Sequence, residues 1–239
     1  MITAHLKKLR LRTAISAEEE RVIRGLISEI RTIPADQVLV RAGDSLTNSL
    51  LLLDGWLVRS KDLPSGDRQI MEIHVAGDFA DLHGFTLKRL DHDVVTITEC
   101  AIGIAPHERL KEVTEKYPHL TRAYWLLTNI DAAIAREMAL SLGQRPAISR
   151  MAHLFCELHV RLEIAGKASD NAFEFPLTQR EMSECLGLTV VHVNRTLQEL
   201  RRRRIVETAN RQLIILDKKG LEALAEFDPL YLQLDRRVL

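Results

Sequence analysis

The sequence has no apolar run that approaches the roughly 20 residues needed to span a bilayer. Its first residues, Met-Ile-Thr-Ala-His-Leu-Lys-Lys, also lack the apolar core of a signal peptide. Both absences remove the usual signs of membrane insertion or export. We therefore expect a cytoplasmic protein without a membrane partner.

Cysteine is scarce in this chain. The three cysteines, Cys100, Cys156 and Cys185, lie far apart and form no pairwise motif. This spacing does not suit a disulfide framework or a zinc site. We interpret all three as small buried hydrophobic residues in a reducing compartment.

Net charge is absent as well, because 33 Lys and Arg residues balance 33 Asp and Glu residues among 239. A neutral total cannot reveal a nucleic-acid partner, so only a local basic patch would do so. The sequence also contains no Ser-His, Cys-His or glycine-rich phosphate motif. These absences predict that the protein is not an enzyme.

Residues 177–207 contain, in order, the signals expected of a helix-turn-helix. Thr178 and Glu181 have the spacing of a capping box, which predicts a helix that begins at Gln179. Gly187 ends this helix after about two turns, because glycine enters the left-handed region without a Cβ clash. Thr189 then caps a second helix.

The second helix has two chemically different faces. Val193, Leu197 and Leu200 recur at helical spacing and should pack inward. The other face carries side chains that suit base edges, since Arg can bind guanine, and Asn or Gln adenine, through paired hydrogen bonds. Arginines at the end of the helix and beyond it suit phosphate. The predicted DNA-binding residues are Thr178, Thr189, Val190, Val191, His192, Asn194, Arg195, Gln198, Arg201, Arg202, Arg203, Arg204 and Arg211.

The residues that follow predict the winged form of this motif. Two short apolar runs, at 205–206 and 213–216, flank a polar tip at 208–211. Between Pro176 and Leu216, seven arginines stand against four glutamates, a net charge of +3. This local patch favours DNA as a partner.

The N-terminal half combines one predicted helix with many short strands. Ser16 and Glu19 form another capping box, and the apolar spacing from Val22 to Ile30 predicts a helix that ends near Pro34. Apolar runs between turn residues predict strands at 38–40, 50–53, 56–59, 70–75 and 94–98. This pattern indicates a small antiparallel barrel or sandwich.

Residues 119–142 contain no helix breaker and predict one long helix. Leu127, Ile130, Ile134 and Met138 form a stripe that indicates a coiled-coil dimer interface. Packing of this stripe on its own domain is the alternative. A hinge at 143–146 precedes a helix at 147–164, the helix-turn-helix and a terminal helix. The predicted domains are residues 1–118, 119–143 and 144–239.

This combination of β-roll, long helix, hinge and winged helix-turn-helix resembles the Crp/Fnr superfamily of bacterial transcription regulators. The residues that carry the resemblance are Gly43, Gly55 and Gly77 at turns of the roll, 149–152 before the helix-turn-helix, the Thr178 and Glu181 pair, Gly187, and Arg195. It implies an α+β fold and a homodimer on a pseudo-palindromic DNA site, with RNA polymerase as a candidate partner. Arg195 matches the family's guanine-contacting arginine. Val191 stands where many members carry glutamate, so their common half-site is not expected.

The same resemblance argues against the usual effectors. Members that bind cyclic AMP use a Gly-Glu pair for the ribose and an Arg-Ser or Arg-Thr pair for the phosphate. Here Gly77-Asp78 is a shortened form of the first pair, and Leu-Asp-His-Asp at 90–93 replaces the second. An iron-sulfur cluster would need cysteines near the N-terminus, and there are none. The cofactor or effector is therefore unidentified.

The densest group of metal-type ligands is Asp81, His83, Asp91, His92 and Asp93. We favour their interpretation as helix caps and solvated loop charges, and we assign no metal site. Two alternative functions use the same residues: a ligand- or metal-binding roll whose helix-turn-helix contacts protein, and a metal-dependent hydrolase. The sequence leaves open the operator and the choice between activation and repression.

Overall fold

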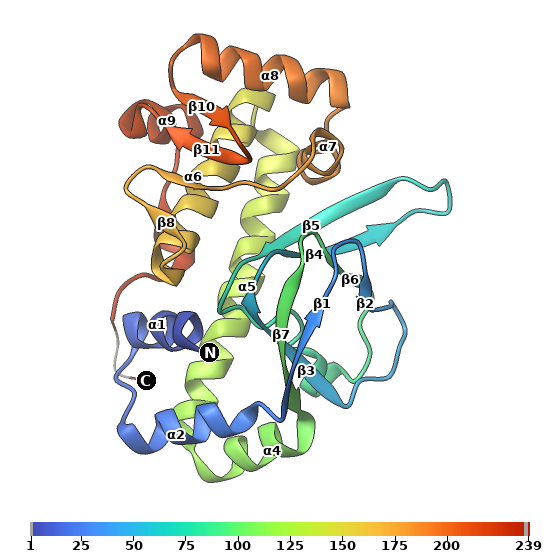
Figure 1. Ribbon diagram of the computed structural model, residues 1–239, viewed down its shortest axis with the longest axis vertical. Coiled ribbons are helices and arrows are strands. Elements are labelled where there is room, and N and C mark those ends of the chain that lie inside the picture. Colours follow the sequence, from blue (N-terminus) through green and yellow to red (C-terminus); the bar gives the residue numbers. More distant parts are fainter. Residues whose placement is uncertain (1, 237–238) are drawn as a thin grey trace.

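The computed structural model describes residues 2–236 and residue 239. Its architecture is α+β, with a pair of sheets beside one long helix and a smaller helical domain at one end (Figure 1). The helices are α1 (Thr3–Arg12), α2 (Ala17–Leu26), α3 (Gly84–Leu87), α4 (His107–Lys116), α5 (Pro118–Gln144), α6 (Ala147–Ala165), α7 (Gln179–Leu186), α8 (Val190–Arg202), α9 (Lys218–Ala225) and the 3-10 helix η1 (Pro229–Leu232). The strands are β1 (Glu29–Ile33), β2 (Val38–Val40), β3 (Asn48–Asp54), β4 (Leu57–Asp62), β5 (Arg68–His74), β6 (Asp93–Thr96), β7 (Cys100–Pro106), β8 (Ala168–Ser169), β9 (Ala172–Glu174), β10 (Val206–Ala209) and β11 (Gln212–Ile215).

The N-terminal sheets form an antiparallel β-roll. One sheet has the strand order β1-β7-β3 and the other β2-β6-β4-β5. Leu52, Leu57 and Ile102 belong to the apolar core of the roll, whereas Val58, one residue after Leu57, belongs to a different core. This alternation is what a strand buried on both faces requires, because successive side chains point to opposite sides. The five predicted strands of this region are all present as β2 to β6.

One prediction for the N-terminal half is wrong, and further elements were not predicted. The helix that begins after Ser16 ends at Leu26, and Ile30, which was assigned to it, lies in β1 opposite Gly103 of β7. That pairing joins residues more than 70 positions apart, so local spacing could not reveal it. Strand β7 and helix α1 were missed, and α1 depends on long-range ion pairs for its cationic side chains.

The roll and the helix-turn-helix domain share one apolar core. Val58 and Ile73 from the roll belong to the same buried cluster as Phe155 of α6 and Met182 of α7. Arg68 of β5 also forms an ion pair with Glu184 of α7. The helix-turn-helix is therefore packed on the roll, and it is not joined to the roll by the hinge alone (Figure 1).

The predicted dimer stripe on α5 is covered within the chain. Ile130 and Ile134 are 6% and 4% exposed, and they pack with Leu232 of η1. Leu127 and Met138 are half-buried against other parts of the same chain. In this arrangement Ile130 and Ile134 are not open to a second copy, because the C-terminal segment folds back onto the long helix.

Candidate nucleic-acid interface

The first helix of the helix-turn-helix begins and ends as the sequence predicts. Thr178 Oγ1 accepts a hydrogen bond from the Glu181 amide at 3.2 Å, and the Thr178 amide donates to Glu181 Oε2 at 2.6 Å. This capping box satisfies amides that the first helical turn leaves free. Gly187 follows α7 at φ 60° and ψ 40°, in the left-handed region. The turn therefore directs the chain into α8.

Helix α8 presents one buried and one exposed face. Thr189 caps it by accepting from the His192 amide, and Val193 and Leu200 are fully buried. Val191, by contrast, is 80% exposed. Arg195 and Gln198 are also exposed and lie on the same face of α8, one and two helical turns after Val191. Only this face is available to a partner.

Most predicted DNA-binding residues are at the surface, but they are not equally free. Thr178 and Thr189 are exposed, yet their hydroxyls serve as helix caps. Asn194 is half-buried, and its amide donates to Gln179 Oε1 at 3.3 Å. Among the described residues, no hydrogen bond or ion pair engages Arg195. Its guanidinium is therefore free to bind a partner.

The arginines after Gln198 differ in their partners. Arg202 and Arg203 both bond to Glu199, and these hydrogen bonds lower the pKa of Glu199 to about 2. Arg204 and Arg211 lie in left-handed backbone conformations, and within residues 2–236 and 239 neither side chain forms a hydrogen bond. Exposed ion pairs are weak, so phosphate could compete for Arg202 and Arg203. At Arg204 and Arg211, phosphate would not have to displace a side-chain partner among the described residues.

The wing is a sheet with the strand order β10-β11-β9-β8. The predicted strand-tip-strand order is present, but β10 extends through Thr208 and Ala209 of the predicted tip, so that only Asn210 and Arg211 lie between β10 and β11. Strands β8 and β9, which were not predicted, extend this sheet beyond β11. Strand β9 pairs with β11, and β8 pairs with β9, so the wing hairpin is fixed against the rest of the domain.

Sequence reasoning missed a residue that positions the interface. Arg150 of α6 donates to the carbonyls of Leu186, Leu142 and Arg145. It therefore ties the end of α7 to the end of α5 across the hinge. The sequence gives only a basic residue near the hinge as a signal, because the three carbonyls come together only in the folded chain.

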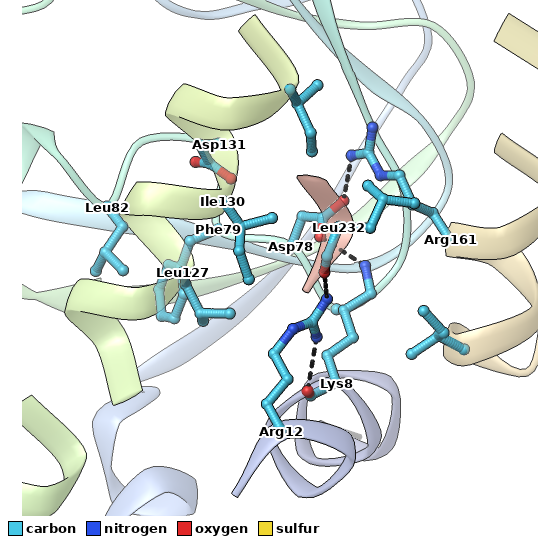
Figure 2. Close-up of a pocket in the computed structure, with 13 residues that line it drawn as sticks. Lys8, Arg12, Asp78, Phe79, Leu82, Leu127, Ile130, Asp131, Arg161 and Leu232 are labelled. Atoms are coloured by element: carbon cyan, nitrogen blue, oxygen red, sulfur yellow. Dashed lines mark hydrogen bonds and ion pairs between the residues drawn. The ribbon is translucent and has the colours of Figure 1, made fainter. Parts of the chain in front are cut away.

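The turn Gly77-Asp78 in the roll lies in a buried ionic cluster. Lys8 Nζ is 2.6 Å from Asp78 Oδ1, and Arg161 Nη2 of α6 is 3.0 Å from Asp78 Oδ2. Burial alone would raise the pKa of Asp78, but the charges of Lys8 and Arg161 hold it well below its usual range. Figure 2 shows these side chains around a cavity of about 40 Å³.

Four of the five candidate metal ligands, all except His83, have other partners. Asp81 is buried and accepts from the Leu50 amide, and Asp91 pairs with Lys61 and His92. Asp93 accepts from the Ala42 amide. Within the part of the chain that the structure describes, no three His, Cys, Asp or Glu residues form a group that could hold a metal ion. No described helix is long and apolar enough to cross a membrane.

Comparison with known proteins matches both halves of the chain. Residues 30–117 match the model of a cyclic nucleotide-binding domain, and residues 149–224 match that of a Crp-like helix-turn-helix domain. The transcriptional activator protein FnrA of Stutzerimonas stutzeri is 24% identical over 92% of this chain and 90% of its own length. The nitrogen fixation regulation protein FixK of Bradyrhizobium diazoefficiens is 28% identical over 76% of each chain. The structure of FixK2 from Bradyrhizobium japonicum superimposes with a TM-score of 0.76 and 22% identity, covering 83% of this chain and 98% of that one.

A β-roll joined through a long helix to a winged helix-turn-helix defines the class: this is a DNA-binding transcription regulator. The two domain matches and the relatives along most of the chain then give the family. The chain belongs to the Crp/Fnr superfamily of transcription regulators.

The cavity beside the Gly77-Asp78 turn is too small for a cyclic nucleotide. A Cβ on Gly77 would lie 2.7 Å from the Ala4 carbonyl carbon, so the α1 backbone already covers this turn. The remaining space of about 40 Å³ could hold roughly three water molecules. Pockets for organic ligands usually exceed about 300 Å³. Asp78 is also already paired with two cations.

Proposed function

We propose that this regulator binds a pseudo-palindromic duplex as a homodimer, with α8 of each subunit in the major groove. The observation that carries the proposal is the exposed face of α8, on which Arg195 has no partner among the described residues. In a symmetric dimer, the two α8 helices would enter successive major grooves about 34 Å apart. The twofold symmetry of the protein would then match that of the site.

We assign base contact to the exposed face of α8. Arg195 would bind guanine O6 and N7, while Gln198 and Asn194 would bind adenine. Val190 and Val191 would contact thymine methyl groups. Since Val191 is an isopropyl group where a carboxylate would be needed to accept from cytosine, the preferred half-site should not require cytosine at that position.

We assign phosphate contact to the arginines beyond this face. Arg204 and Arg211 support the assignment best, because their side chains have no hydrogen-bond partner within residues 2–236 and 239. Arg201, whose guanidinium is 3.5 Å from the Thr208 carbonyl, is a further candidate. Arg202 and Arg203 would exchange Glu199 for phosphate.

The dimer would form through the exposed face of α5. Trp125, Ala132 and Ala139 recur every seven residues, all are exposed, and Trp125 is 67% exposed. A seven-residue repeat keeps one face toward a partner helix, and alanine allows close approach. This face replaces Ile130 and Ile134 in the proposed interface, because those two side chains already pack on η1.

Binding-site selection from random duplexes tests the base assignment. Arg195→Ala should lose about 1–3 kcal/mol of specific affinity and relax one base position. Arg204→Ala, the matched control with the same truncation, should weaken all sequences similarly and reduce the salt slope by about one. If Arg195→Ala retains the wild-type preference, the assignment of Arg195 is wrong.

A further inference from the structure

The N-terminal helix closes the cavity beside the Gly77-Asp78 turn. The backbone of α1 lies directly on the Gly77-Asp78 turn, where a Cβ on Gly77 would come within 2.8 Å of the His5 nitrogen. His5 Nδ1 is 2.9 Å from the Gly77 carbonyl in a fully buried contact. Lys8 supplies the cation for Asp78. Atoms of α1 thus occupy the space in which a ligand would have to lie to contact the Gly77-Asp78 turn.

One carboxylate links α1 to the DNA-binding domain. Asp78 Oδ1 meets Lys8, and Asp78 Oδ2 meets Arg161 of α6. Arg161 is 6% exposed and also donates to the Ile73 carbonyl and to Glu157. Lys8, itself 6% exposed, and Arg161 would therefore repel each other if Asp78 did not lie between them. Displacement of Lys8 or Arg161 therefore changes the electrostatic surroundings of the other side chain.

A second contact links α1 to the C-terminal segment. Arg12 donates to the Lys8 carbonyl and to the Leu232 carbonyl, each at 2.8 Å. Leu232 covers Ile130 and Ile134 of α5, and Tyr231 donates to Glu157 beside Arg161. Figure 2 shows α1, α5, α6 and η1 converging on the same cavity. The pocket is closed on all these sides by the chain itself.

We propose that α1 is a built-in occupant of the site beside the Gly77-Asp78 turn, and that the Lys8-Asp78-Arg161 bridge couples the docking of α1 to the packing of the helix-turn-helix domain on the roll. A signal would act by drawing α1 away from Asp78. Binding of a cyclic nucleotide at Asp78 would not occur while α1 is docked. The proposal goes beyond DNA binding and does not depend on it.

Hydrogen exchange of the full-length protein, read by mass spectrometry, tests the coupling. Lys8→Met removes the charge but keeps the length of the side chain, and it should speed exchange in residues 3–12 at least tenfold. Arg161→Met should change exchange in the same residues although it lies on α6, because Arg161 and Lys8 share the carboxylate of Asp78. Lys7 is the exposed neighbour of Lys8 on α1. Lys7→Met is therefore the matched control, and it should leave exchange unchanged both in residues 3–12 and in the wing strands.

Two results would overturn the proposal. In the first, Arg161→Met leaves the exchange of residues 3–12 and of the wing strands as in the wild type. This result would show that α1 and α6 are not coupled. The second test uses the wild-type protein and so does not depend on whether a variant folds. Millimolar cyclic AMP should leave exchange of α1 and the melting temperature unchanged, and binding would show that the pocket is open. Neither measurement uses DNA, so failure to find an operator would not affect them.

Discussion

The packing of the C-terminal segment on α5 gives a prediction whose size can be worked out. Leu232 is 1% exposed against Ile130 and Ile134. Leu232→Ala removes three carbon atoms, which at about 0.8 kcal/mol each amounts to about 2.4 kcal/mol of lost burial. The cavity that remains adds to this, so we expect a loss of about 2–5 kcal/mol in the free energy of unfolding.

Urea denaturation measures this loss, and the same short helix offers a matched control. Leu230 is 66% exposed, so Leu230→Ala should change the free energy of unfolding by no more than about 0.5 kcal/mol. Equal effects of the two variants would contradict the packing described here. A stronger dimer in Leu232→Ala, without loss of stability, would instead favour Ile130 and Ile134 as the dimer interface that the sequence predicted.

The remaining predictions concern the dimer and pH. Ala139→Glu should weaken self-association in sedimentation experiments by placing charge on the exposed face of α5, whereas Ala223→Glu on α9 should not; equal dimerisation of both would exclude this face. Burial lowers the pKa of His5 to about 4, so the folded state favours the neutral ring. Stability from this group should be complete above about pH 6.5 and decline as the pH falls toward 4. His5→Phe should reduce that decline in urea titrations, and an identical decline would count against the assignment.

The helix-turn-helix could be predicted in detail because its signals are local. The capping box of Thr178 and Glu181, the turn at Gly187 and the cap at Thr189 each act within about four residues. Backbone hydrogen bonding over such short spans depends on residue type more than on distant packing. The sequence therefore specified the start, turn and exposed face of the DNA-binding element before any tertiary contact was known.

The elements that the sequence did not predict have a common physical origin, which is pairing between distant parts of the chain. Strand β1 exists because Glu29–Ile33 pairs with β7, and helix α1 is stabilised by an ion pair with a turn 70 residues away. The apolar stripe on α5 was interpreted as a dimer interface, because spacing alone cannot say which surface covers it. The chain's own η1 covers Ile130 and Ile134.

What the sequence determined by itself is the set of local elements and the chemistry of α8, because capping, turn geometry and helical periodicity are properties of neighbouring residues. Only the tertiary structure decided which faces stay exposed and which buried charges meet. Asp78 is the clearest case: in the sequence it belongs to a short turn motif, and in the fold it lies between Lys8 and Arg161. Burial of an ionised carboxylate is costly unless cations or hydrogen-bond donors from elsewhere in the chain reach it, and this is a property of the folded arrangement.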